Sequence, residues 1–143
     1  MAGGALFNHL DYSFSIGSEN GQDTTYKAPG GGSPELRKHF GVLKQYFDQL
    51  NFINLQPDPL AVIASPGATT FTLTDGKTEW VIYIESLTSK THDLVTKIPR
   101  GKYQLTWMDV TTGQVIASEN TTGKNIKVPP ALVDKVAHIK LIK

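Results

Sequence analysis

Hydrophobic and polar residues follow different spacings in different parts of the chain. Between residues 34 and 51, apolar side chains recur every three or four positions, which is the spacing of one face of an α-helix. They are Leu36, Phe40, Leu43, Phe47 and Leu50. Ser33, Pro34 and Glu35 favour a helix start, through a capping hydroxyl, a residue without an N–H, and a charge that complements the helix dipole. We predict a helix over 34–51.

From residue 60 onward the apolar positions have period two, as in strands with one buried face. Turn signals that contain glycine or proline separate the segments. The predicted strands span residues 60–65, 69–74, 80–85, 93–98, 103–109, 115–121, 126–128 and 138–142. Two of these strands each carry three in-phase residues that we expect in the core. They are Trp80, Ile82 and Ile84, and Tyr103, Leu105 and Trp107.

A third pattern precedes the helix. Residues 5–10 read as a short strand, and a glycine-rich loop without apolar periodicity follows over about 15–32. We therefore predict a mainly β chain: an antiparallel β-sandwich of about seven to eight strands, preceded by a strand-loop-helix extension. The predicted division is an extension over 1–56 and a sandwich domain over 57–143.

Composition narrows the functional classes. The net charge is +1 with scattered lysines, so no basic surface for nucleic acid is expected. Cysteine is absent, and the four histidines lack metal-ligand spacing, so we expect neither disulfides nor a metal site. No segment approaches the roughly 20 apolar residues of a membrane helix, and no cofactor motif occurs. We predict no nucleic-acid, membrane, metal or cofactor partner.

Four segments resemble a known family. They are AGGALFNHLDYSF over 2–14 with the glycines at 30–32, LQPD over 55–58, WVIY over 80–83 and YQLTWMDVTTG over 103–113. They are similar to the C-terminal part of bacterial apiosidase-like glycoside hydrolases of Bacteroides-like bacteria. The resemblance implies that 1–56 is the last strand, loop and helix of the catalytic (β/α) barrel. It also implies that 57–143 is the β-sandwich behind that barrel, a domain described as collagen-binding.

The resemblance implies a parent enzyme that is secreted or periplasmic. An eight-stranded (β/α) barrel takes about 250 residues, so this chain of 143 cannot contain one. We predict that the chain is not an enzyme but an accessory module that scaffolds the barrel and binds carbohydrate or a matrix polymer. The alternative is a glycoside hydrolase whose sugar site uses Asp11 and the loop carboxylates Glu19 and Asp23.

Acidic and aromatic residues are the candidates for binding a substrate. Asp11 lies at a predicted strand end, where barrel enzymes place active-site groups, and Tyr12 beside it could stack on a sugar. We favour the simpler interpretation, in which Asp11 caps loop N–H groups. Trp80 and Trp107, together with Tyr83 and Tyr103, could form a sugar-stacking platform. We favour a place in the sandwich core instead, since buried tryptophans are usual there.

The apolar stripe of the helix predicts an association. In an intact barrel protein this stripe would pack against barrel strands. Here it could fold back on the sandwich or pair with a second copy around a two-fold axis, and we favour a homodimer through residues 34–51.

Overall fold

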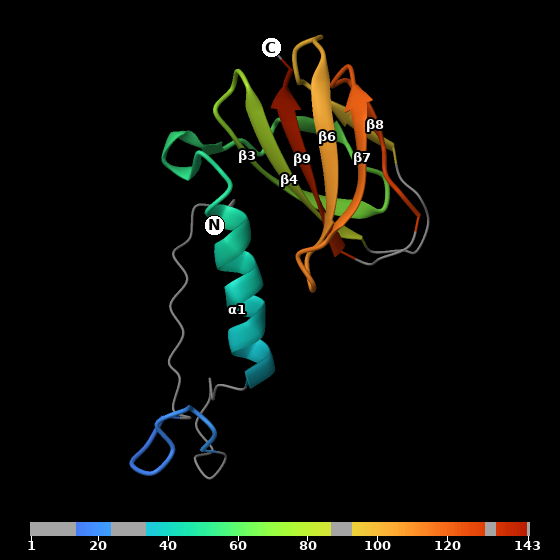
Figure 1. Cartoon of the computed structure of the whole chain (residues 1–143). Coiled ribbons are helices and arrows are strands. Elements are labelled where there is room, and N and C mark those ends of the chain that lie inside the picture. The colour runs from blue at the N-terminus through green and yellow to red at the C-terminus, as the bar shows by residue number, and fades with distance from the viewer. Residues whose placement is uncertain (1–13, 24–33, 87–92, 131–133, 143) are drawn as a thin grey trace. The chain divides into compact units, whose positions relative to one another are not determined.

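The computed structural model describes residues 14–23, 34–86, 93–130 and 134–142. Within these residues the chain forms nine strands in two antiparallel sheets and one α-helix, which confirms the mainly β class (Figure 1). The chain divides into two compact units. One is Leu6–Leu50, and the other contains Asn51–Lys143. That the first unit is a barrel remnant stays a prediction.

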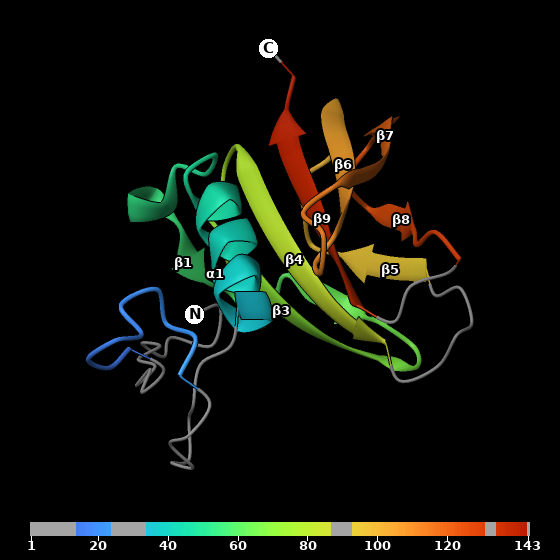
Figure 2. The same ribbon diagram turned by 60° about the horizontal axis from the view of Figure 1, so that its bottom comes forward.

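The described elements have the following bounds. The helices are α1 (Pro34–Phe47) and the 3-10 helix η1 (Phe52–Asn54). The strands are β1 (Gln56–Pro57), β2 (Val62–Ala64), β3 (Ala68–Thr74), β4 (Glu79–Ser86), β5 (Asp93–Thr96), β6 (Tyr103–Asp109), β7 (Val115–Thr121), β8 (Asn125–Lys127) and β9 (Asp134–Leu141). The six-stranded sheet has the order β1-β3-β4-β9-β6-β7, and the three-stranded sheet has the order β2-β5-β8. Figure 2 separates β5 and β8 of the smaller sheet from β4, β9 and β6 of the larger one.

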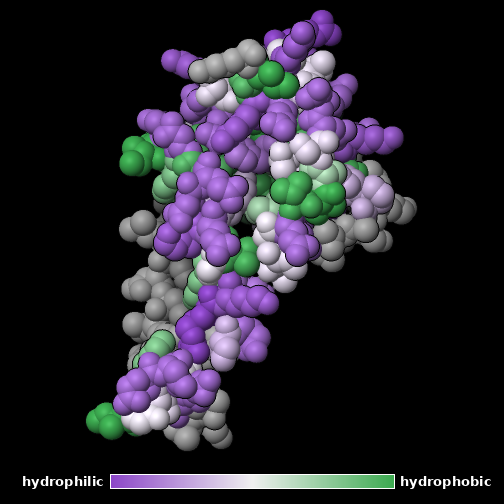
Figure 3. Space-filling view, in the orientation of Figure 1, coloured by the Kyte–Doolittle hydropathy of each residue, from purple (hydrophilic) through white to green (hydrophobic). Residues whose placement is uncertain are grey.

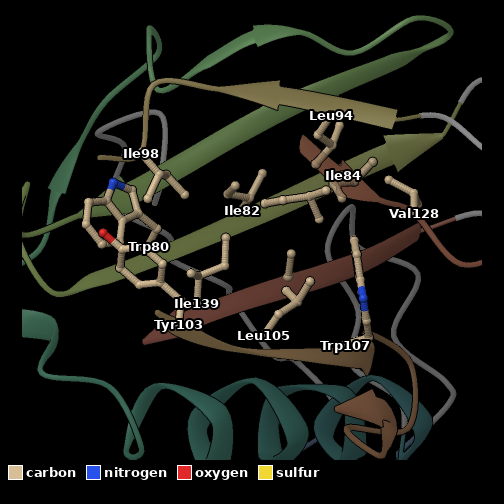
Figure 4. Close-up of a cluster of buried hydrophobic side chains, with 12 residues drawn as sticks. Trp80, Ile82, Ile84, Leu94, Ile98, Tyr103, Leu105, Trp107, Val128 and Ile139 are labelled. Carbon is tan, nitrogen blue, oxygen red and sulfur yellow. The ribbon is translucent and has the colours of Figure 1, made fainter. Parts of the chain in front are cut away.

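One hydrophobic cluster takes its side chains from strands of both sheets, as in a β-sandwich. Figure 4 shows aromatic rings at both ends of this cluster and aliphatic side chains between them. At one end Trp80 and Tyr103 meet edge to face, with ring centroids 5.6 Å apart. All six residues that the alternation placed in the core are at most 3% exposed, so this prediction is confirmed.

Tight turns join the strands where the sequence places glycine after a polar residue. In the β3–β4 turn, Asp75 Oδ1 accepts hydrogen bonds from the backbone N–H groups of Lys77, Thr78 and Glu79 at 2.7–2.9 Å. Gly123 has a φ of +89°, and a Cβ there would lie 2.8 Å from Ile98 Cγ2, so both conformation and space require glycine.

Strands β6 and β7 have the predicted bounds, and the bounds of the other predicted strands differ by one to four residues. The two-residue strand β1 was not predicted, because it contains a proline and is too short to show alternation. Strand β9 begins at Asp134 instead of 138; its buried Lys135 broke the apolar pattern, and Lys135 Nζ donates to the Pro129 carbonyl at 2.9 Å.

Helix α1 ends at Phe47 instead of residue 51. The backbone bonding changes after Asp48: Gln49 and Leu50 donate to carbonyls three residues back, not four. The buried positions also differ from the predicted stripe, since Tyr46 is 7% exposed and Leu43 is 41% exposed.

Candidate functional site

Two of the predicted site residues, Asp11 and Tyr12, lie outside the described residues. Their role at a sugar site stays a prediction. The described part of the same loop includes the other two carboxylates of that hypothesis. Glu19 Oε1 accepts the Gly17 N–H at 2.9 Å, and Asp23 Oδ2 accepts the Ser15 hydroxyl at 2.5 Å. Both carboxylates therefore stabilise the conformation of their own loop.

The other two predicted site residues are Trp80 and Trp107, which are 3% and 0% exposed. Trp107 Nε1 donates to Glu119 Oε1 at 3.3 Å, so the polar atom of this buried ring has a partner. A sugar that stacks on an aromatic ring needs one open face of that ring. The burial of both indoles favours the core interpretation over the stacking platform.

An aromatic and apolar row crosses the outer face of the six-stranded sheet, opposite the core. Tyr83 lies between the core residues Ile82 and Ile84, so its side chain points to the other face. Strand register places one residue from each of four other strands in line with it. This outer row is Phe71, Tyr83, Val136, Met108 and Val115.

The two ends of the outer row are open to solvent and its centre is buried. Phe71 is 42% exposed and Val115 is 63% exposed, whereas Val136 and Met108 are 6% and 8% exposed. Near Val115, a bulge in the pairing of β6 with β7 accompanies Ile116, which is 42% exposed. In Figure 3, apolar patches interrupt a mostly hydrophilic surface, one of them where Figure 1 draws β6 and β7.

The end of the row at β3 and β4 is aromatic. The rings of Phe71 and Tyr83 have centroids 6.2 Å apart and planes inclined by 44°. We call these two rings the aromatic platform. Because strand neighbours lie about 4.8 Å apart, two adjacent rings give a surface two strands wide.

A polar row runs beside the aromatic platform, and its members lie two residues from Phe71, Tyr83 and Val136 on the same strands. Register aligns Thr69, Glu85 and Asp134 in this polar row. Tyr83 joins the two rows, because its hydroxyl donates to Asp134 Oδ2 at 2.8 Å. Partial burial, this hydrogen bond and the charges of both carboxylates raise the pKa of Tyr83 to about 12. The phenol therefore keeps its proton at neutral pH, and its oxygen can still accept one hydrogen bond.

An ionic cluster occupies another part of the same face. His138 Nε2 lies 2.7 Å from Glu79 Oε1, and Lys140 Nζ lies 3.3 Å from the same oxygen. Burial lowers the pKa of His138, and the charge of Lys140 adds to this, while Glu79 opposes it. The imidazole is therefore neutral at pH 7, and its Nε2–H donates to the carboxylate.

Apart from Tyr83, the residues of the outer row were not predicted from the sequence. Alternation shows that Tyr83 faces away from the core, but it does not show which residues of β3 and β9 lie beside it. That information is in the strand order, which places Phe71 and Val136 beside Tyr83 although they lie 12 and 53 residues from it in the sequence. Within the described ranges, no group of three His, Asp or Glu residues could hold a metal ion, and no helix is long and apolar enough to cross a membrane.

Comparisons with known proteins find solved structures with a similar fold. No protein-family model matches the chain, and no curated protein matches it. One similar solved structure is described as a glycoside hydrolase family 5 from Bacteroides vulgatus ATCC 8482. It matches with a TM-score of 0.61 and 13% identity, over 81% of this chain and 29% of that chain. A second, described as a glycoside hydrolase, has a TM-score of 0.57 and 13% identity, over 82% and 30%.

This likeness establishes the fold alone. The chain folds like part of these glycoside hydrolases and spans less than a third of their length. The apiosidase-like and collagen-binding features of the sequence resemblance stay predictions.

Proposed function

We propose that this chain is a non-catalytic accessory β-sandwich module of a glycoside-hydrolase-like protein. In such a protein it would buttress the catalytic barrel and bind carbohydrate or a matrix polymer. The observation that carries the proposal is the fold match, which takes in 81% of this chain but 29% of the family 5 hydrolase. A module of a larger enzyme gives this combination of high and low coverage.

Two further observations support a role without catalysis. A (β/α) barrel takes about 250 residues, whereas the unit Leu6–Leu50 is far smaller. Glycoside hydrolysis needs two carboxyl groups that flank the scissile bond. Of the three candidate carboxylates, Glu19 and Asp23 accept hydrogen bonds within their own loop. A secreted or periplasmic location belongs to the same proposal, through the resemblance of the parent protein.

A hydrolysis assay tests the proposal. The purified chain is incubated with aryl glycosides and with soluble polysaccharides, and released phenol and reducing ends are measured. We expect release equal to that of a buffer blank. Turnover that is abolished by Asp11→Asn and retained by Glu35→Gln, a control in the exposed first turn of α1, would support the hydrolase alternative instead.

A further inference from the structure

We infer that the aromatic platform and the polar row beside it form a binding site for an uncharged saccharide. The inference rests on the proposed function, because it names the ligand class that the accessory module would take. It moves the sugar-binding surface from the buried Trp80 and Trp107 to the outer face of β3, β4 and β9. The juxtaposition that carries it is Phe71 and Tyr83 beside Thr69, Glu85 and Asp134.

The aromatic platform exposes a flat apolar surface. Phe71 is 42% exposed in the middle of a seven-residue strand, next to Tyr83. The outer face of an antiparallel sheet normally carries polar residues where it meets water. A pyranose has an apolar C–H face, and that face packs on aromatic rings. A platform of two adjacent rings offers this kind of contact.

The polar row supplies hydrogen-bonding groups at the border of the platform. Side chains two positions apart on a strand are separated by about 6.8 Å, so the polar row borders the aromatic platform. The Tyr83 hydroxyl is fixed by donation to Asp134 Oδ2, which leaves its oxygen free to accept from a sugar hydroxyl. Glu85 and Thr69 are exposed and add acceptors on the same side. Apolar contact with a few placed polar groups is the usual composition of a small-molecule site.

The polar row carries negative charge. Glu85 and Asp134 are both carboxylates, and both raise the pKa of Tyr83, so they act on the platform electrostatically. The same field would repel a uronic acid or a sulfated sugar. We therefore expect neutral polysaccharides to bind and polyanionic ones not to bind.

Affinity electrophoresis of the full chain tests the site. The protein is run in native gels that contain no polymer, hydroxyethyl cellulose, xylan, galactomannan or polygalacturonate. We expect at least one neutral polymer to retard the wild type, and we expect Phe71→Ala to weaken that retardation by about tenfold or more. Tyr83→Phe keeps the ring and loses the hydroxyl, so it should weaken binding less.

Three controls keep the test decisive. Val115→Ala removes an exposed apolar side chain at the other end of the outer row and should leave retardation unchanged. Phe71→Trp keeps a flat ring and should keep binding, which separates loss of the platform from loss of folding. A single cooperative unfolding transition for Phe71→Ala gives the same check.

Several outcomes would overturn the site. They are no retardation in any neutral gel, retardation that Phe71→Ala leaves unchanged, and retardation by polygalacturonate alone. These outcomes are distinct from failure of the proposed function. The accessory role fails only if the chain releases reducing ends or aryl groups, whatever its mobility in the gels.

Discussion

At the residue scale, buried and exposed aromatic side chains differ in what they can do. Trp107 is 0% exposed and Phe71 is 42% exposed, although both lie on strands of the same sheet. Trp107 stabilises the fold through the apolar area that it buries, and its Nε1 has a partner in Glu119. Phe71 presents part of its ring to solvent, where it is accessible to a ligand.

Truncation of the two rings should therefore have different effects on stability. We expect Trp107→Ala to lower the free energy of unfolding by about 3–5 kcal/mol, because it leaves a cavity in the core. Phe71→Ala should lower this free energy less, by about 1–2 kcal/mol, because its ring is partly exposed and loses only the contact with Tyr83 and its partial burial. Urea denaturation followed by circular dichroism measures both. A Trp107→Ala variant with the midpoint of the wild type would contradict the core assignment.

His138 should make stability depend on pH. Its folded-state pKa lies below the ordinary value of 6.5, because burial disfavours the imidazolium despite the contact with Glu79. The unfolded state therefore binds the proton first as the pH falls. The free energy of unfolding should decrease below pH 6.5 and level off once the folded state is protonated too.

Urea denaturation between about pH 7 and pH 5 measures this dependence. His138→Gln keeps a donor for Glu79 and should flatten the curve. His39→Gln, at an exposed position of α1, should leave the curve of the sandwich unchanged. A slope that survives His138→Gln in full would show that another group is responsible.

At the element scale, the β3–β4 and β6–β7 turns share one arrangement: an aspartate carboxylate accepts hydrogen bonds from the N–H groups that follow it. Asp75 does this between β3 and β4, and Asp109 does it between β6 and β7, where it accepts from Thr111 and Thr112. Partial burial alone would raise the pKa of Asp75. The hydrogen bonds from Thr78, Lys77 and Glu79 outweigh it and lower this pKa to about 2.

Removal of the Asp75 carboxylate should weaken the β3–β4 hairpin. We expect Asp75→Ala to lower the free energy of unfolding by about 1–2 kcal/mol, since three N–H groups lose their acceptor at an exposed turn. Lys77→Ala in the same turn keeps those bonds and serves as the control. Equal midpoints of thermal unfolding for the two variants would count against the role of the carboxylate.

Strands and turns were predictable from the sequence because their signals are local. Trp80, Ile82 and Ile84 alternate within one strand, and Asp75 and Gly76 mark the turn before it. The outer row is not local, since Phe71 and Val115 share it only through the order β3-β4-β9-β6-β7. Local patterns therefore indicated Trp80, Tyr83 and Trp107 as site candidates and did not indicate Phe71.

The homodimer through residues 34–51 stays a prediction. Light scattering at micromolar concentration tests it, with Phe40→Glu combined with Phe47→Glu as the variant. A monomeric wild type would exclude pairing, and a double mutant that stays dimeric would place the contact on another surface.

At the scale of the whole molecule, the fold, the length of the chain and one exposed surface are consistent with the same role. The fold is shared with parts of glycoside hydrolases, and the chain spans less than a third of those proteins. The sandwich has its own core, and its outer face carries the aromatic platform. An accessory module with this arrangement should bind a glycan without cleaving it.

Binding without turnover is the most direct test of that claim. The chain is mixed with the neutral polysaccharide that retards it most, and bound protein and released reducing ends are measured in the same sample. We expect binding that depends on Phe71 and no reducing ends above the blank. Reducing ends that increase with time and with protein concentration would contradict it.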